Sequence, residues 1–172
     1  MPSTSISRST LSEVLGMHIK EIFGIGYHSE SVSHCAHFVS HVMGYHGSAV
    51  TCANYSWDLR QTAESKGLQG ATLRVDDIFK RCPEVGEWSS KEVSLTKCLA
   101  FITKKSAVNI KKRQMAPIPR KHIGIFCDNR IWHYSNTRNK VVCQTVPDFK
   151  KHYGTSEIAQ KTYQLYYGKF PI

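Results

Sequence analysis

The chain has 172 residues and carries 23 Lys and Arg against 13 Asp and Glu, a formal charge of +10 with histidine neutral. A hydrophobic content of 41% with 11 Gly and 6 Pro excludes a disordered or collagen-like chain, and the length suits a single domain with a sizeable core. The excess of positive charge indicates an acidic partner, such as nucleic acid, anionic lipid or an acidic cell-wall polymer.

The N-terminal part of the chain predicts a flexible start followed by two helices. Residues 1–10 are rich in Ser and Thr and are expected to be flexible. Leu11 to Phe23 has apolar residues at helical spacing, which predicts one amphipathic helix. Ser33 then suits the N-cap of a second helix that runs from Cys35 to Met43 and ends at Gly44.

No targeting or membrane segment is evident. The start of the chain has no basic segment followed by an apolar core, so we recognise no signal peptide and expect synthesis in the cytoplasm. Runs such as CLAFI and HIGIF are far shorter than the roughly 18 apolar residues of a membrane span. We therefore expect no span.

The middle of the chain predicts two more helices, a strand and a basic segment. A helix is expected over Trp57 to Ser65, and Asp76 and its acidic neighbour begin another that Pro83 stops. Val93 to Thr103 is apolar enough to be one strand or two. Lys104 to Lys121 carries seven basic residues and no acidic one, which predicts an exposed loop or an extended edge.

The C-terminal third predicts an antiparallel sheet. We expect four strands there: His122–Cys127, Arg130–Asn136, Lys140–Val146 and Lys161–Tyr167. The chain shows no internal repeat and no linker, so residues 1–172 are expected to form a single α+β domain with helices first and strands later.

Six cysteines are spread along the chain without any C-x-x-C pair, which argues against a zinc ribbon or a thioredoxin-type motif. Their density is far below that of a disulfide scaffold, so most are expected to be reduced and buried. A cysteine that does chemistry must therefore be recognised from its surroundings. The six are Cys35, Cys52, Cys82, Cys98, Cys127 and Cys143.

The segment SHCAHFVSHVMGY, residues 33–45, places Cys35 in the first turn of a helix. Phe38, Val39 and Val42 lie on the same side of that helix, so Cys35 faces the protein. The free N–H groups and positive potential of a helix start lower a thiol pKa and can hold an oxyanion. Cys35 is therefore a candidate nucleophile, and an inert buried cysteine is the simpler alternative.

The segment KHIGIFCDNRIWHYSN, residues 121–136, predicts a hairpin, because Asp128 and Asn129 suit a two-residue type I′ turn. This turn places His122 and His133 on one face of the sheet within side-chain reach. The predicted pairs are Cys127–Arg130, Ile125–Trp132, Gly124–His133 and His122–Ser135. The opposite face is nearly all apolar: Ile123, Ile125, Cys127, Trp132 and Tyr134.

A neutral histidine beside a thiol can act as a general base, and a polar partner on its second ring nitrogen holds the required tautomer. His122 is the predicted base and His133 its orienting partner. Asp128 or Asn136 would take the place of His133 in another register. Two exposed histidines on a solvated sheet face are the simpler alternative.

A Cys that opens a helix as C-A-x-F-V-x-x-V-x-G-Y, followed by H-I-G-I-F and, after a turn, by I-W-H, resembles the NlpC-like cysteine peptidases. The resemblance implies a papain-like fold, with Cys35 as nucleophile, His122 as base and His133 as the residue that orients it. It also implies no cofactor and no metal, and hydrolysis of amide bonds in peptidoglycan stem peptides, as an endopeptidase or an amidase.

Six further residues are expected to contact the substrate: Tyr27, His34, Tyr45, Lys111, Lys112 and Arg113. The first three lie beside or within the nucleophile segment. The last three belong to the basic stretch before His122, which would border the cleft and hold stem-peptide carboxylates.

The expected partner is peptidoglycan or another peptide-like substrate. A wall hydrolase made without a signal peptide needs a dedicated export route or a lysis system, as an antibacterial effector injected by a secretion machine has. It would act at the cell wall, in the periplasm or outside the cell. An acidic immunity protein that blocks the Cys35 cleft would then be a further partner.

Three other functions are compatible with the sequence. His34, His37 and His41 follow H-x-x-H-x-x-x-H, which could bind zinc, although no fourth ligand is obvious. The basic stretch could contact nucleic-acid phosphates, although no recognised nucleic-acid motif is present, so this partner is not expected. A papain-like thiol acyltransferase or deamidase that acts on a protein would use the same catalytic residues.

Overall fold

The computed structural model describes residues 6–22, 33–43 and 74–171 of the chain. These residues form an α+β fold around a six-stranded sheet of order β1-β8-β2-β5-β6-β7, in which neighbouring strands are antiparallel. The α+β class with an antiparallel sheet is therefore confirmed. Among the described residues, no helix is long and apolar enough to cross a membrane.

The strands of the main sheet are β1 (Val85–Glu87), β2 (Lys97–Lys104), β5 (His122–Cys127), β6 (Arg130–Ser135), β7 (Lys140–Thr145) and β8 (Tyr163–Gly168). A small second sheet pairs β3 (Val108–Asn109) with β4 (Gln114–Met115). The α-helices are α1 (Arg8–Glu13), α2 (Ile19–Ile22), α3 (Cys35–Val42), α5 (Val75–Arg81), α6 (Val146–Lys150) and α7 (Glu157–Thr162).

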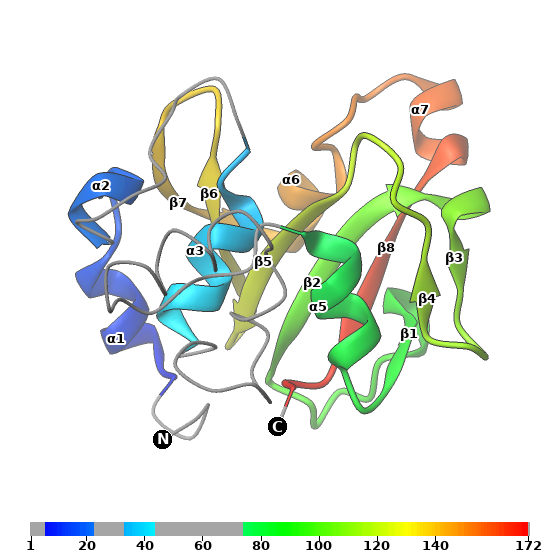
Figure 1. The fold of residues 1–172 in the computed structure, drawn as a ribbon, viewed down its shortest axis with the longest axis horizontal. Helices are drawn as coiled ribbons and strands as arrows, with labels where there is room; N and C mark the ends of the chain where they lie inside the picture. Colours follow the sequence, from blue (N-terminus) through cyan, green and yellow to red (C-terminus); the bar gives the residue numbers. More distant parts are fainter. Residues whose placement is uncertain (1–5, 23–32, 44–73, 172) are drawn as a thin grey trace, which may run out of the picture.

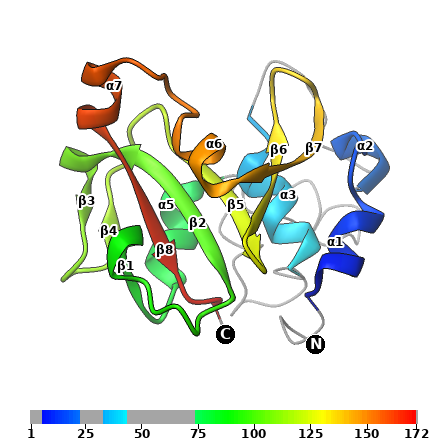
Figure 2. The same ribbon diagram turned by 180° about the vertical axis from the view of Figure 1, so that it is seen from behind.

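The sheet carries an apolar core on each face. Side chains alternate along β2, so that Leu99 and Phe101 join one core and Ala100 and Ile102 join the other. The first core also contains residues of α1, α2, α3 and α5, which lie on one side of the sheet in Figure 1. The second core contains Phe149 of α6, and Figure 2 shows α6 on the opposite side. Both faces are covered, which explains why β2 and β5 are almost continuously apolar.

The predicted helix over Leu11 to Phe23 is wrong, because the chain breaks there into α1 and α2. Gly16 takes a φ of +80° between them, a conformation that favours glycine. Its N–H donates to the Val141 carbonyl at 2.9 Å, and the Val141 N–H donates to the Met17 carbonyl at 3.0 Å. These bonds tie the break to the edge strand β7, a contact that helical periodicity does not reveal. Within residues 1–10, positions 8–10 already belong to α1 and positions 1–5 lie outside the described residues.

Helix α3 confirms the predicted second helix to within one residue, but its N-cap position is His34 and not Ser33. Helix α5 confirms the predicted helix that begins at Asp76 and ends before Pro83. The helix expected over Trp57 to Ser65 lies outside the described residues.

The predicted strands are confirmed with shifts at their ends. The first begins at Lys97 instead of Val93, which is 95% exposed and lies in a turn segment. The last begins at Tyr163 because α7 extends to Thr162. The basic stretch is not featureless, since β3 and β4 form a short hairpin within it.

The β5–β6 turn is confirmed. Asp128 and Asn129 have φ angles of 47° and 70°, as a type I′ turn requires. The ladder contains the pairs Ile125–Trp132, Phe126–Ile131 and Cys127–Arg130. The predicted pairs Gly124–His133 and His122–Ser135 are not part of this ladder.

Candidate active site

Cys35 is the first residue of α3 and is only 2% exposed. Its sulfur lies 3.3 Å from the Ser33 hydroxyl and accepts a hydrogen bond from the backbone N–H of Ile123. Ile123 directly follows His122 at the start of β5. The thiol is therefore held beside the strand end from which His122 projects.

The helix start is fixed to the sheet by Asn136, which follows β6. Its side-chain oxygen accepts the His34 N–H at 2.9 Å, and its amide donates to the Ser33 hydroxyl at 3.0 Å. Asn136 thus positions the segment that carries Cys35, whereas Asp128 lies in the turn at the other end of β5. Neither residue takes the place of His133 beside the imidazole of His122.

The pKa of the Cys35 thiol is raised, chiefly because burial disfavours the thiolate. The hydrogen bonds from Ser33 and from the backbone N–H groups of Ile123 and Ala36 oppose this shift but do not cancel it. The thiolate expected at a helix start is therefore not the resting form, because burial raises the thiol pKa by more than the hydrogen bonds at the helix start lower it. The resting group is a neutral thiol.

His122, His133 and Gln144 form a hydrogen-bonded chain across β5, β6 and β7. Nε2 of His122 lies 2.8 Å from Nδ1 of His133, and Nε2 of His133 lies 2.7 Å from Oε1 of Gln144. Because the Gln144 oxygen can only accept, His133 donates from Nε2 and accepts at Nδ1. His122 must then donate from Nε2, which leaves the lone pair on its Nδ1. This is the tautomer that a general base needs.

Gly124 makes room for this chain between the two strands. A Cβ there would lie 3.1 Å from Cβ of His133, 3.0 Å from the Trp132 carbonyl oxygen and 2.6 Å from the Ile131 side chain. Sequence reasoning brought His122 and His133 together correctly but missed Gln144. The alternation of side chains along the predicted strand Lys140–Val146 could have identified Gln144. It lies on the opposite face of β7 from Cys143 and on the same face of the sheet as His133.

Both imidazoles are neutral near neutral pH. The pKa of His122 lies well below its ordinary value, first because of burial and then because of His152 and His133. Burial lowers the pKa of His133 to about 4, against the opposing effect of the Gln144 hydrogen bond. A buried neutral imidazole is able to accept a proton, as a general base does.

His152 completes this side of the site and was not predicted, since it belongs to no motif. Its ring stacks on His122 with centroids 3.8 Å apart and planes 8° apart. Phe149 of α6 packs against both His122 and His133, at centroid distances of 5.5 and 5.1 Å. The imidazoles are therefore enclosed by α6 and the segment that follows it.

The thiol and the imidazoles approach the start of β5 from opposite faces of the sheet. Cys35 belongs to the core on the α3 face, whereas His122 contacts Phe149 on the α6 face. In the described part of the chain, no hydrogen bond joins the Cys35 sulfur to the His122 ring. Burial raises the pKa of Tyr153, which follows His152, and a negative charge on Cys35 would raise it further.

The remaining predicted contact residues are not gathered at this point. His34 is 1% exposed and packs against His37 and Tyr134, so it lies in the interior and not in a cleft. Tyr27 and Tyr45 lie outside the described residues.

The three basic residues Lys111, Lys112 and Arg113 occupy the turn between β3 and β4. The Arg113 guanidinium donates to the carbonyls of Cys82 and Pro83, each at 3.3 Å, at the end of α5. In both Figure 1 and Figure 2 this turn lies away from the start of β5. The expectation that these side chains border the Cys35 cleft therefore does not agree with the fold.

Two hollows on the surface are lined by other residues. One of about 550 Å³ lies between α5 and the β3–β4 hairpin, and one of about 510 Å³ lies between α6, β8 and Trp88. Among the described residues, no group of three or more His, Cys, Asp or Glu side chains is arranged to hold a metal ion. His34 and His37 instead contact each other, with Nδ1 atoms 3.1 Å apart.

Comparisons with known proteins place the chain in no group. It matches no protein-family model, no curated protein and no solved structure. The function must therefore be argued from the site.

Proposed function

We propose that the protein is a cysteine hydrolase of the papain-like, NlpC type that cleaves amide bonds. The observation that carries the proposal is the chain from Gln144 through His133 to His122, which holds a neutral imidazole with its free lone pair on Nδ1. This base lies at the strand end where the backbone of Ile123 holds the Cys35 sulfur. A thiol, a base and an orienting pair are the three parts that nucleophilic catalysis by cysteine requires.

Catalysis starts from a neutral pair, because burial keeps both the thiol and the imidazole uncharged. His122 Nδ1 accepts the thiol proton as the sulfur bonds to the amide carbon. Backbone N–H groups at the start of α3 stabilise the oxyanion. His122 then gives the proton to the amine as the C–N bond breaks, which leaves a thioester on Cys35.

Hydrolysis of the thioester reverses these roles. A water molecule gives a proton to His122 Nδ1 while its oxygen bonds to the acyl carbon. The C–S bond breaks, the carboxylic acid leaves, and the sulfur takes back the proton. This mechanism requires the Cys35 sulfur and His122 Nδ1 to come within hydrogen-bond distance of each other at the start of β5 in the substrate complex.

The substrate is a peptide-like amide, and we propose peptidoglycan stem peptides. The arrangement of a nucleophile helix on an antiparallel sheet supports the NlpC-type fold. The formal charge of +10 favours an acidic polymer of this kind over a neutral one. In this proposal the enzyme acts at the cell wall, as an endopeptidase or an amidase, and the positive charge of the chain favours an acidic inhibitor protein as a further partner.

Digestion of purified sacculi, followed by mass analysis of the released fragments, tests the proposal. The wild-type protein should release fragments that differ from the substrate by one hydrolysed amide. Cys35→Ala should release none while keeping the melting temperature within a few degrees. Cys143→Ala, which removes a half-buried thiol on β7, is the matched control and should stay active. Equal release by wild type and Cys35→Ala would overturn the mechanism.

A further inference from the structure

Arg120 stands two residues before His122 in an unusual backbone conformation. Its φ is +63°, which costs a residue other than glycine about 1 kcal/mol. The hydroxyl of the buried Thr103 donates to the Arg120 carbonyl at 3.2 Å and holds the backbone in place. Strain of this kind persists only where the surrounding structure holds it in place, and it is concentrated at functional sites.

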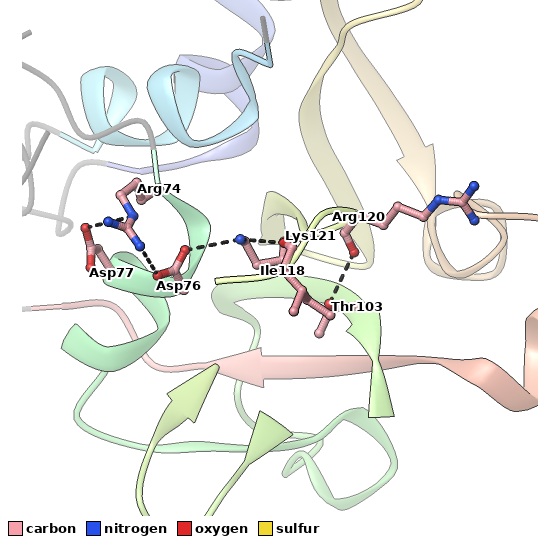
Figure 3. Close-up of polar contacts among 7 residues, drawn as sticks. All are labelled: Arg74, Asp76, Asp77, Thr103, Ile118, Arg120 and Lys121. Carbon is pink, nitrogen blue, oxygen red and sulfur yellow. Dashed lines mark hydrogen bonds and ion pairs between the residues drawn. The ribbon is translucent and has the colours of Figure 1, made fainter. Parts of the chain in front are cut away.

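Arg120 and Lys121 point in opposite directions (Figure 3). The Lys121 ammonium donates to the Ile118 carbonyl at 2.6 Å and lies 3.4 Å from a carboxylate oxygen of Asp76, which also pairs with Arg74. The charge of Lys121 is therefore used inside the fold. Arg120 is exposed, and no carboxylate pairs with it in residues 6–22, 33–43 and 74–171.

The Arg120 guanidinium is nevertheless oriented. One of its nitrogens, Nη1, donates to the Tyr163 hydroxyl at 2.8 Å. Tyr163 packs against Tyr153 with ring centroids 4.8 Å apart, and Tyr153 packs edge-on against His152, whose ring stacks on His122. A positive group with free N–H donors is thus held beside the segment that encloses the imidazoles.

We infer that Arg120 binds a carboxylate of the substrate, so that the enzyme selects acidic peptides. This inference rests on the proposed function of the Cys35 site. A guanidinium offers two parallel donors that match a carboxylate, and its orientation by Tyr163 reduces the entropy lost on binding. Arg120 thereby takes the role that the sequence suggested for Lys111, Lys112 and Arg113.

Steady-state kinetics on soluble disaccharide-peptide fragments from sacculi test the inference. Arg120→Ala should raise KM by about 10-fold or more and change kcat by less than about twofold, because the lost bond is made equally in the ground and transition states. Arg120→Lys should recover only part of the loss. Arg130→Ala, which removes the same charge at the opposite end of β5, is the control and should behave as wild type. An unchanged KM in Arg120→Ala would overturn the inference.

A binding measurement separates this inference from the proposed chemistry. Calorimetry with the Cys35→Ala protein compares the same fragments before and after methyl esterification of their carboxyl groups. The free acids should bind more tightly than the esters by a factor of about 10 or more. In the double variant that carries both Cys35→Ala and Arg120→Ala, this difference should disappear. Equal binding of acids and esters would overturn the role of Arg120, whereas absence of hydrolysis by wild type would overturn only the proposed function.

Discussion

The two ends of the β5–β6 hairpin are built in different ways. At the turn end, Asp128 and Asn129 take positive φ angles and the strands pair residue by residue. At the other end, the imidazoles of His122 and His133 bridge the strands. The turn end is determined by local backbone chemistry, whereas the histidine end depends on segments far apart in the sequence. Buried polar groups are concentrated at the second end, so stability and activity should respond to different substitutions at the two ends.

The largest effect is expected from loss of the proposed base. His122→Ala should lower kcat/KM on sacculus fragments by about 10²–10⁴-fold, the usual contribution of a general base. Asn129→Gly at the turn end keeps the positive φ and is the control. If His122→Ala retains wild-type kcat/KM in a fragment-release assay, His122 is not the base.

Acid should destabilise the fold through the histidine end. The pKa of His133 is lowered to about 4, so below pH 6.5 the unfolded chain binds a proton that the folded chain does not. Stability is therefore full above pH 6.5 and falls as the pH drops toward 4. His133 alone should cost about 2 kcal/mol between pH 6.5 and 5, and His122 adds to the loss in the same direction.

Urea unfolding at pH 7.5, 6.5, 5.5 and 5.0 measures this dependence, in a range where most carboxylates remain ionised. His133→Asn removes the titrating group and should flatten the slope. A wild-type free energy of unfolding that stays constant from pH 7.5 to 5.0 would contradict the burial of neutral imidazoles.

Gln144 should matter through the tautomer it selects. Gln144→Leu removes the acceptor for the His133 Nε2–H and should lower kcat by about 10- to 100-fold with little change in KM. Gln144→Glu restores the acceptor, and its charge should raise the pKa of His133 and move the acidic limb of the pH–rate profile upward. An identical pH–rate profile in Gln144→Glu and wild type would show that Gln144 does not act through His133.

The smallest effect is expected at the turn. At the φ of 70° that Asn129 adopts, alanine has a higher conformational free energy than asparagine. Asn129→Ala should therefore destabilise the fold by about 1 kcal/mol. Activity should not change, because the turn lies at the far end of β5 from His122. If the Asn129→Ala protein is fully folded under the assay conditions and still loses activity, the two ends of the hairpin are coupled.

The helix that carries Cys35 and the pairing of His122 with His133 were both readable from the sequence. Helical spacing between Cys35 and Val42 predicts α3, and a two-residue turn with alternating side chains predicts the shared face of the two histidines. The break at Gly16 was not readable, because it depends on backbone hydrogen bonds between residues 16–17 and Val141. Local periodicity carries no information about such partners.

The resting state of the site could not be read from the sequence either. A helix start predicts a lowered thiol pKa, but burial of Cys35 reverses the direction. His152 and Gln144 join the imidazoles only because α6 folds back over the sheet and β7 pairs with β6.

Local sequence patterns give the α+β class, the helix that carries Cys35 and the β5–β6 turn, and the turn with alternating side chains then places His122 and His133 on one face. The tertiary structure decided which positive charge is available. The stretch from Lys104 to Lys121 carries seven basic residues. Among them, Lys121 pairs with Asp76, Arg113 donates to backbone carbonyls, and Arg120 is oriented by the Tyr163 hydroxyl. A count of charges cannot distinguish these cases, because the free energy of a charge depends on the partners and the solvent exposure that folding assigns to it.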